Sequence, residues 1–285
     1  MIEELNDSFP YNIMTQEFSG KEIKKMYSRL SIHSSRISKA WNQELNSQWL
    51  IRDYIAGKLI MVSTIMLSSS MHANKLNLRI ADPYLLYYSV FNCARAVVLT
   101  CPTIDWNNND FFTMAHSKII AHLGGIVSEY DREVGERIKK FIDEAREYRE
   151  VFSYKFPANG ITTHHKDISD IINVCKLLCE ISQFQTKILE KAITKNVSED
   201  VGVNPAYFDI GYIYGHKNFQ FFDEEDKYRL DKIIRKQKRP YCLYSTFIEG
   251  IVEDFFGAWC SNEVNQDSEY IYNPDLEWDI IFPFE

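Results

Sequence analysis

The pattern of apolar residues between positions 132 and 157 predicts an amphipathic helix with a polar end. Arg146, Arg149 and Ser153 fall on the face next to its apolar stripe. Pro157 cannot donate to a helical ladder, so we expect the helix to stop just before it and to leave the polar residues near its end. The apolar residues recur at alternating spacings of four and three, which defines one stripe of a helix: Val134, Ile138, Phe141, Ala145, Tyr148 and Phe152.

A strongly apolar stretch from 46 to 71 predicts a long buried helix. Arg52, Asp53 and Lys58 interrupt it, so burial in a helical core fits better than a membrane span. Ahead of it, the first 45 residues mix polar residues with scattered aromatics. Only a short helix after Ser19 is predicted there.

A second apolar helix is predicted to begin at Asp82. Asp82 can cap free backbone amides, and Pro83 is tolerated in a first turn. Asn92 and Arg95 lie together on one side of this helix. Because both side chains are costly to bury without partners, they either face a groove, a subunit contact or the end of the 132–154 helix, or form an ordinary satisfied pair in the core.

Histidines occur in two places of interest. A third helix is predicted after the turn-rich loop at 103–110, and it carries His116 and His122. Their separation of six residues puts them on different faces, whereas a shared metal would favour a separation of four. His116 could bind a phosphate, cap a neighbour or be merely structural. His164 and His165 are adjacent in a later loop.

The last third of the chain differs in character from the helical part. Asp167 or Ser169 is expected to cap a long helix that continues to about Thr194. Residues 201 to 222 are rich in Tyr, Phe and Gly, which fits short strands or an ordered loop. The fold class predicted from these patterns is mainly α.

Composition excludes some classes of protein. A hydrophobic content of 45% and an aromatic content of 14% exclude a disordered chain. We expect no membrane span and no signal peptide, and therefore a cytoplasmic protein, because the chain has no run of about 18 apolar residues and a polar, acidic start. No metal or other cofactor is predicted. The six cysteines form no C-x-x-C pair and are expected to be buried free thiols.

The net charge of -8 is unevenly placed. Residues 241–285 contain ten acidic residues and no Lys or Arg, so this tail carries -10 and the preceding 240 residues carry +2. Seven cations between Lys227 and Arg239 form either a solvated helix face or a partner for the acidic tail or for a phosphate backbone. The acidic total argues against non-specific binding to duplex nucleic acid but is compatible with a local basic groove.

Three motifs, taken in order, resemble the HEPN superfamily. They are DPYLLYYSVFNCARAVVL at 82–99, AHSKII at 115–120 and AREYREVFSY at 145–154. That family has an A-Y-Y-A-x-F-x-A-A-R-A-L-L helix, a T-H-S helix start and an L-R-x-x-R helix end. The resemblance covers about residues 46–194. It implies an antiparallel bundle of four or five helices, commonly paired as a two-fold homodimer whose motif ends meet in a cleft.

With this resemblance the chain divides into three segments. Residues 1–45 would be an N-terminal extension and residues 46–195 the HEPN-like bundle. Residues 196–285 would be an aromatic-rich extension with short strands, a basic helix and an acidic tail.

Active HEPN ribonucleases have an arginine followed by a histidine, with four to six residues between them. The histidine can move protons while the arginine stabilises charge on the phosphate. Arg149 matches this arginine, but residues 154–156, where the histidine would stand, contain none. For Arg146 the histidine would stand at residues 151–153, which also contain none. Ser153 and Tyr154 more closely resemble a branch of the same family that has an Asp-Tyr pair near this site. A phenol, with a pKa near ~10, is a poor general base at neutral pH.

Two functions follow from the resemblance. The first is an RNA-cleaving or RNA-binding effector of a bacterial conflict system, either phage defence or toxin–antitoxin; an active form would be a metal-independent endoribonuclease. The second is a non-catalytic module that binds a partner nuclease or nucleotidyltransferase through its acidic aromatic tail. The tail aromatics could instead pack on the chain's own body. The expected catalytic residues are Arg149, Tyr154 and Arg146, and the expected RNA-binding residues are Asn92, Arg95 and His116.

Overall fold

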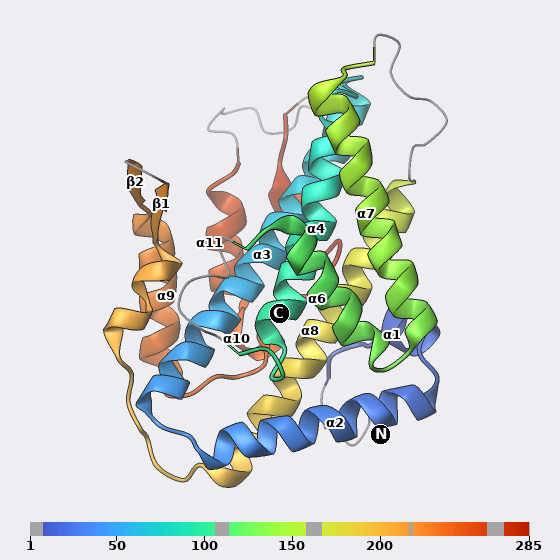
Figure 1. The fold of residues 1–285 in the computed structure, drawn as a ribbon. Helices are drawn as coiled ribbons and strands as arrows, with labels where there is room; N and C mark the ends of the chain where they lie inside the picture. Colours follow the sequence, from blue (N-terminus) through green and yellow to red (C-terminus); the bar gives the residue numbers. More distant parts are fainter. Residues whose placement is uncertain (1–7, 106–113, 158–166, 217–218, 261–270, 285) are drawn as a thin grey trace.

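The computed structural model describes residues 8–105, 114–157, 167–216, 219–260 and 271–284. Long helices that run side by side form its centre, and neighbours joined by short connections run in opposite directions (Figure 1). The mainly helical class predicted from the sequence is therefore confirmed. These central helices are α3 (Gln43–Lys75), α4 (Asp82–Thr100), α6 (His116–Ser128), α7 (Arg132–Tyr154) and α8 (Ile168–Asn196).

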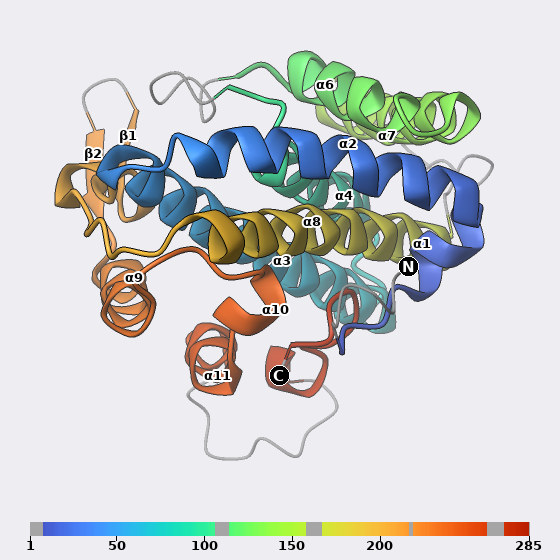
Figure 2. The same ribbon diagram turned by 90° about the horizontal axis from the view of Figure 1, so that it is seen from below.

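Helices α1 (Asn12–Glu17) and α2 (Gly20–Lys39) lie across one end of this bundle, with α2 packed along α8 (Figure 2). A capping box starts α2, because Ser19 and Glu22 each accept a hydrogen bond from the other's backbone N–H. The sequence predicted only a short helix here, yet α2 has 20 residues. The buried face of α2 begins with apolar residues and continues with serines. A pattern of apolar residues alone therefore shows only its first half. The buried residues are Ile23, Met26, Leu30, Ser34 and Ser38.

The start of α4 differs from the prediction. Asp82 is the first helical residue, and the N-cap position is Ala81, which has no side chain to cap with. The Asp82 carboxylate instead accepts hydrogen bonds from Ser70 Oγ at 2.8 Å and Asn74 Nδ2 at 3.0 Å, both on α3. The predicted cap is therefore wrong, because tertiary partners on the neighbouring helix bind the carboxylate.

The predicted helix boundaries around residues 154–167 are confirmed. α7 ends at Tyr154, and the backbone N–H groups of Lys155 and Phe156 both donate to the carbonyl of Val151. Phe156 adopts a φ of 40°, which turns the chain away from the helix just before the proline. Asp167 is the N-cap of α8 and accepts a hydrogen bond from the N–H of Ser169 at 3.0 Å.

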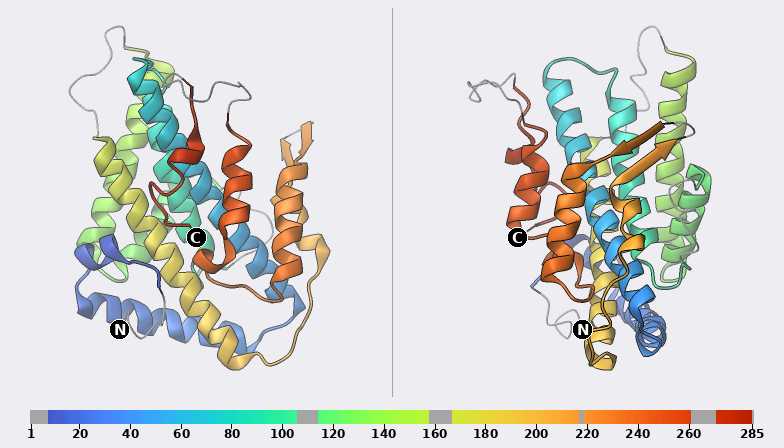
Figure 3. Two further views of the ribbon diagram at one scale, coloured as in Figure 1. Left: turned by 180° about the vertical axis from the view of Figure 1, so that it is seen from behind. Right: turned by 90° about the vertical axis from the view of Figure 1, so that its left-hand side faces the viewer.

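The C-terminal segment covers one side of the bundle (Figure 3). An antiparallel hairpin pairs Ile213 with Phe222 and His216 with Phe219. Of the two alternatives for residues 201–222, short strands or an ordered loop, the structure therefore has the short strands. The elements of this segment are η2 (Pro205–Tyr207), η3 (Asp209–Gly211), β1 (Ile213–His216), β2 (Phe219–Phe222), α9 (Glu224–Lys236), α10 (Leu243–Thr246), α11 (Glu249–Gly257) and η4 (Pro274–Leu276).

One hydrophobic core joins the three sequence segments. Phe9 and Phe282, near opposite ends of the chain, have ring centroids 5.0 Å apart within this core. Gly57 on α3 makes room for Phe247, because a Cβ there would lie 2.0 Å from the Phe247 ring. Five tail phenylalanines among the described residues are buried in the chain's own body, whereas Trp259 is 57% exposed; the buried ones are Phe247, Phe255, Phe256, Phe282 and Phe284.

A polar network fastens α9 and the hairpin to α3. The Asp226 carboxylate accepts hydrogen bonds from Tyr54 and Tyr214, both at 2.8 Å, and forms an ion pair with Lys58. Arg229 on α9 binds both Asp226 and Asp254 of α11, the latter through Nε at 2.6 Å. Arg229, one of the seven cations between Lys227 and Arg239, is thus buried and paired with Asp254 of the acidic tail. Pairing with the tail was one of the alternatives that the charge pattern left open.

Five of the six cysteines are buried, and all six are free thiols. The sulfurs of Cys93 on α4 and Cys179 on α8 lie 3.8 Å apart in the bundle core. Across the described ranges, no three His, Cys, Asp or Glu side chains gather in a way that could hold a metal ion. None of the described helices combines the length and the apolar character that crossing a membrane requires.

Asp53 is a buried carboxyl group on α3, and both of its oxygens lack a hydrogen-bond partner among the described residues. Burial raises its pKa well above the ordinary value; Arg52 opposes this shift and Glu190 adds to it. At a pH above ~3.9, the ordinary pKa of an aspartate, the unfolded chain has released the Asp53 proton, whereas the folded protein still holds it. The free energy of unfolding consequently falls as the pH rises above that value.

Asp53→Asn is expected to stabilise the protein increasingly from pH 5 to pH 8. The gain over wild type should grow by about 1.4 kcal/mol per pH unit until the pH reaches the folded-state pKa. Urea unfolding of both proteins at the two pH values measures it. Asp170→Asn, an exposed substitution on α8, is the matched control. A gain of equal size at both pH values would contradict the assignment of a proton to Asp53.

Candidate functional site

Four of the six predicted site residues gather where α4, α6 and α7 meet. The helix α6 begins at His116, beside the middle of the bundle (Figure 1), and its N-cap residue makes no side-chain cap. Aromatic side chains of α4 hold the imidazole ring instead. Its Nδ1 lies 2.7 Å from the hydroxyl of Tyr87, and the ring stacks on Phe91 with centroids 4.3 Å apart.

The arginines of α7 face the same aromatic residues. The Arg149 guanidinium lies 5.2 Å from the ring centroid of Tyr87 and 6.0 Å from that of Tyr88. Arg149 and Arg146 share one carboxylate, Glu150, at 3.5 and 3.8 Å respectively. Their side chains are only 15% and 24% exposed, and the Nε of each lacks a hydrogen-bond partner among the described residues. The pair is thus mostly buried but incompletely bonded.

Burial and the neighbouring charges together favour the neutral form of the His116 imidazole. Burial lowers its pKa, and the positive charges of Arg149, Arg95 and Arg146 lower it further against the opposing effect of Glu150. Arg95, which extends from α4, is itself largely buried, and this burial lowers its pKa to about 10. Three guanidinium groups from two helices therefore act on one imidazole. We call Arg95, His116, Arg146 and Arg149 the arginine–histidine cluster.

Two predicted site residues lie elsewhere in the described structure. Asn92 is 6% exposed, and its amide nitrogen is 3.7 Å from the sulfur of Met66 on α3, so it belongs to the helical core. Tyr154 is 80% exposed at the end of α7. His164 and His165 fall outside the described residues.

Sequence reasoning missed the aromatic floor of the cluster. Tyr87, Tyr88 and Phe91 were part of an apolar helix pattern, and nothing in that pattern distinguishes a core ring from one that holds a histidine. Their spacing of three and four residues places them on one face of α4, which was the available signal. Glu150 was also missed, although it follows Arg149 directly.

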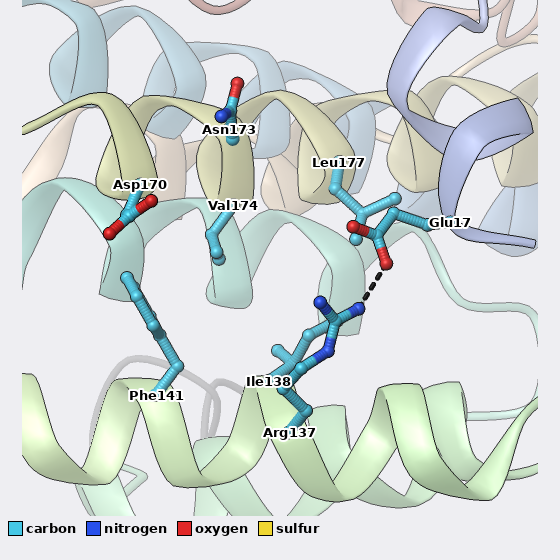
Figure 4. A pocket seen from close by; sticks show the side chains of 8 residues that line it. All are labelled: Glu17, Arg137, Ile138, Phe141, Asp170, Asn173, Val174 and Leu177. Carbon is cyan, nitrogen blue, oxygen red and sulfur yellow. Dashed lines mark hydrogen bonds and ion pairs between the residues drawn. The ribbon is translucent and has the colours of Figure 1, made fainter.

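A separate groove lies between α7 and α8 and has a volume of about 380 Å³ (Figure 4). An ion pair between Arg137 and Glu17 links α7 to α1 at one end, and Asp170 lies toward the other. Its apolar lining consists of Ile138, Phe141, Val174 and Leu177. None of the six predicted site residues lines this groove.

Comparison with known proteins finds no relative of this chain. No family model matches the chain, and neither a curated protein nor a solved structure is significantly similar to it. The fold defines a mainly helical protein with one small antiparallel hairpin among the described residues. The resemblance to the HEPN superfamily stays a prediction from sequence motifs.

Proposed function

We propose that this chain is a HEPN-like protein of a bacterial conflict system, either phage defence or toxin–antitoxin, that binds or cleaves RNA at the arginine–histidine cluster. One observation carries the proposal. The three motifs of the resemblance are far apart in sequence, yet each contributes a residue to the cluster: His116 contacts the aromatic floor, Arg149 faces it, and the charges of Arg149 and Arg95 both act on His116.

The chemistry of the cluster suits a phosphate backbone. Guanidinium groups bind phosphate oxygens in a forked geometry, and Arg146 and Arg149 bring two of them together beside the aromatic floor. Aromatic side chains beside cations are also what proteins use to stack unpaired bases. Arg149 and Arg146 would stabilise the charge that develops on phosphorus during cleavage without a metal. In a homodimer, two clusters would face one cleft, and Tyr154 would assist from its exposed position.

Arg149→Ala is expected to reduce RNA cleavage by at least tenfold and to relieve growth inhibition on expression, because it removes the guanidinium nearest the aromatic floor. Arg149→Lys should recover only part of the activity, since lysine lacks the fork. Arg132→Ala on the exposed surface of the same helix is the control. Cleavage of labelled RNA by purified protein measures the effect. If wild type and Arg149→Ala are equally harmless and neither degrades nor binds RNA, the proposal fails.

A second function is favoured by the hairpin. Every residue of β2 is exposed, including Phe219 at 68%, Phe221 at 50% and Phe222 at 47%. Clustered exposed aromatics of this kind mark interaction surfaces. The chain would then be a non-catalytic module that binds a partner nuclease or nucleotidyltransferase. Wild-type protein that binds no RNA in the assay above but co-purifies with such a partner would favour this function.

A further inference from the structure

We propose that His116 supplies the proton-transfer function of the histidine that is missing after Arg149. It would remove the proton from the 2′-hydroxyl of RNA bound at the arginine–histidine cluster. This inference rests on the proposed function, because it needs RNA at that cluster. It differs from the sequence prediction, in which His116 only binds RNA and Tyr154 takes the catalytic part.

The position of His116 supports this role. It enters the cluster as the first residue of α6, and its ring is held from two directions by Tyr87 and Phe91. Nδ1 is occupied by the Tyr87 hydroxyl at 2.7 Å, whereas Nε2 has no partner among the described residues. The ring is only half-buried, so Nε2 is the nitrogen available to a substrate.

The contact with Tyr87 is compatible with the tautomer of His116 that a general base needs. When Nδ1–H donates to the Tyr87 oxygen, Nε2 carries the lone pair that a general base needs. The pKa of Tyr87 is raised, mainly by burial, so this oxygen stays a neutral phenol at physiological pH. In the proposed role Tyr87 is a positioning residue, which holds the ring through Nδ1 and leaves Nε2 toward the substrate.

The surrounding charges keep the imidazole in its basic form. Burial and three arginines lower the pKa of His116, so most molecules carry a neutral ring at pH 7. Glu150 opposes this shift, and Asp143 on the same helix pairs with Arg146 at 3.4 Å. The charged and titratable groups that face His116 come from α4 and α7 and are Tyr87, Tyr88, Arg95, Arg146, Arg149 and Glu150.

The reaction balances without a cofactor. Nε2 of His116 takes the proton of the 2′-hydroxyl while the 2′-oxygen forms a bond to phosphorus. The bond from phosphorus to the 5′-oxygen breaks, and this oxygen takes a proton from water. The hydroxide left behind accepts the proton from the imidazolium, which restores the free base. The products are a 2′,3′-cyclic phosphate and a 5′-hydroxyl, and Arg146 and Arg149 neutralise charge on the phosphate in between.

His116→Gln in the full chain tests the proposal with a labelled single-stranded RNA. We expect cleavage to fall by about 100-fold while RNA affinity stays unchanged, because a general base contributes to the rate and not to binding. His122→Gln on the same helix should cleave like wild type. Imidazole added to His116→Ala should restore cleavage. Wild-type activity should rise with pH through a midpoint below the ordinary histidine value of ~6.5, and His116→Gln should lose this rise.

Tyr87→Phe provides a second variant that keeps the aromatic stack. It should lower kcat with little change in KM and should shift the pH midpoint, because only the oxygen bonded to Nδ1 is lost. His116→Gln that cleaves like wild type, or that loses RNA binding together with cleavage, would overturn the proposal. Wild type that binds RNA without cleaving it overturns the catalytic role alone. Wild type that neither binds nor cleaves RNA overturns the proposed function as well.

Discussion

Asp226→Ala is expected to destabilise the protein by about 3–5 kcal/mol, because it leaves the buried Arg229 and the half-buried Lys58 without their shared carboxylate. The Asp226 side chain is 3% exposed and binds Lys58 and Arg229, as well as the hydroxyl groups of Tyr54 and Tyr214. Burial alone would raise its pKa, but Lys58 and the hydrogen bonds from the two tyrosines hold the pKa below the ordinary value. Its stabilising effect is therefore present at neutral pH and is lost as the pH falls through that lowered pKa.

The substitution should also loosen one part of the molecule more than the rest. Asp226 connects α9 and the hairpin to α3, so hydrogen exchange should accelerate first in residues 205–236. Urea unfolding measures the total effect. Asp231→Ala, on the exposed face of α9 where Asp231 pairs with Lys227 at 3.2 Å, should change stability by less than about 0.5 kcal/mol. Equal effects of the two substitutions would contradict this account of the network.

Arg52→Met should also lower the free energy of unfolding by about 3–5 kcal/mol, because it removes hydrogen bonds to carbonyl groups at the end of α4. The last carbonyls of a helix have no partner within it. Arg52 donates to three carbonyl groups here, with distances of 2.6 Å to Leu99, 3.0 Å to Cys101 and 3.3 Å to Ile104. Its guanidinium also stacks over Trp49 at 3.9 Å. Methionine fills much of the same volume but donates no hydrogen bond, so all three carbonyls would lose this donor, although the Cys101 carbonyl keeps a bond from the Ile104 N–H at 3.2 Å.

Chemical denaturation followed by circular dichroism measures this loss. Arg36→Met removes an exposed arginine from the last turn of α2 and should change stability by less than about 0.5 kcal/mol. Arg52→Lys should fall between wild type and Arg52→Met, because one ammonium group cannot reach all three carbonyls. A stability of Arg52→Met within 1 kcal/mol of wild type, roughly the value of a single hydrogen bond, would show that the carbonyls find other partners.

The helices were predictable where local signals and the core agree. The stripe on α7 has the period of a buried helix face, and Asp167 caps α8 as its side-chain chemistry predicts. Prediction failed where tertiary contacts replaced a local signal. Asp82 binds side chains of α3 instead of capping α4, and the second half of α2 buries serines that a hydropathy pattern reads as exposed.

The candidate site was predictable only in part. Arg146 and Arg149 are one turn apart on the same helix, so their proximity follows from the helical period alone. Whether His116 and Arg95 join them depends on how α6 and α4 pack against α7, which no local pattern encodes. The same packing puts Asn92 in the core, although it lies on the same helix as Arg95 and only three residues before it.

The sequence by itself determined the helical class, the end of α7, the start of α8 and the two arginines of α7, because these depend on interactions within a few residues. Tertiary structure decided everything that depends on neighbours distant in sequence. It made Arg52 a cap for α4, buried Arg229 against the acidic tail and packed the tail phenylalanines into the common core. It also placed His116 against Tyr87 beneath the arginines, because only the packing of α6 on α4 brings these side chains within bonding distance.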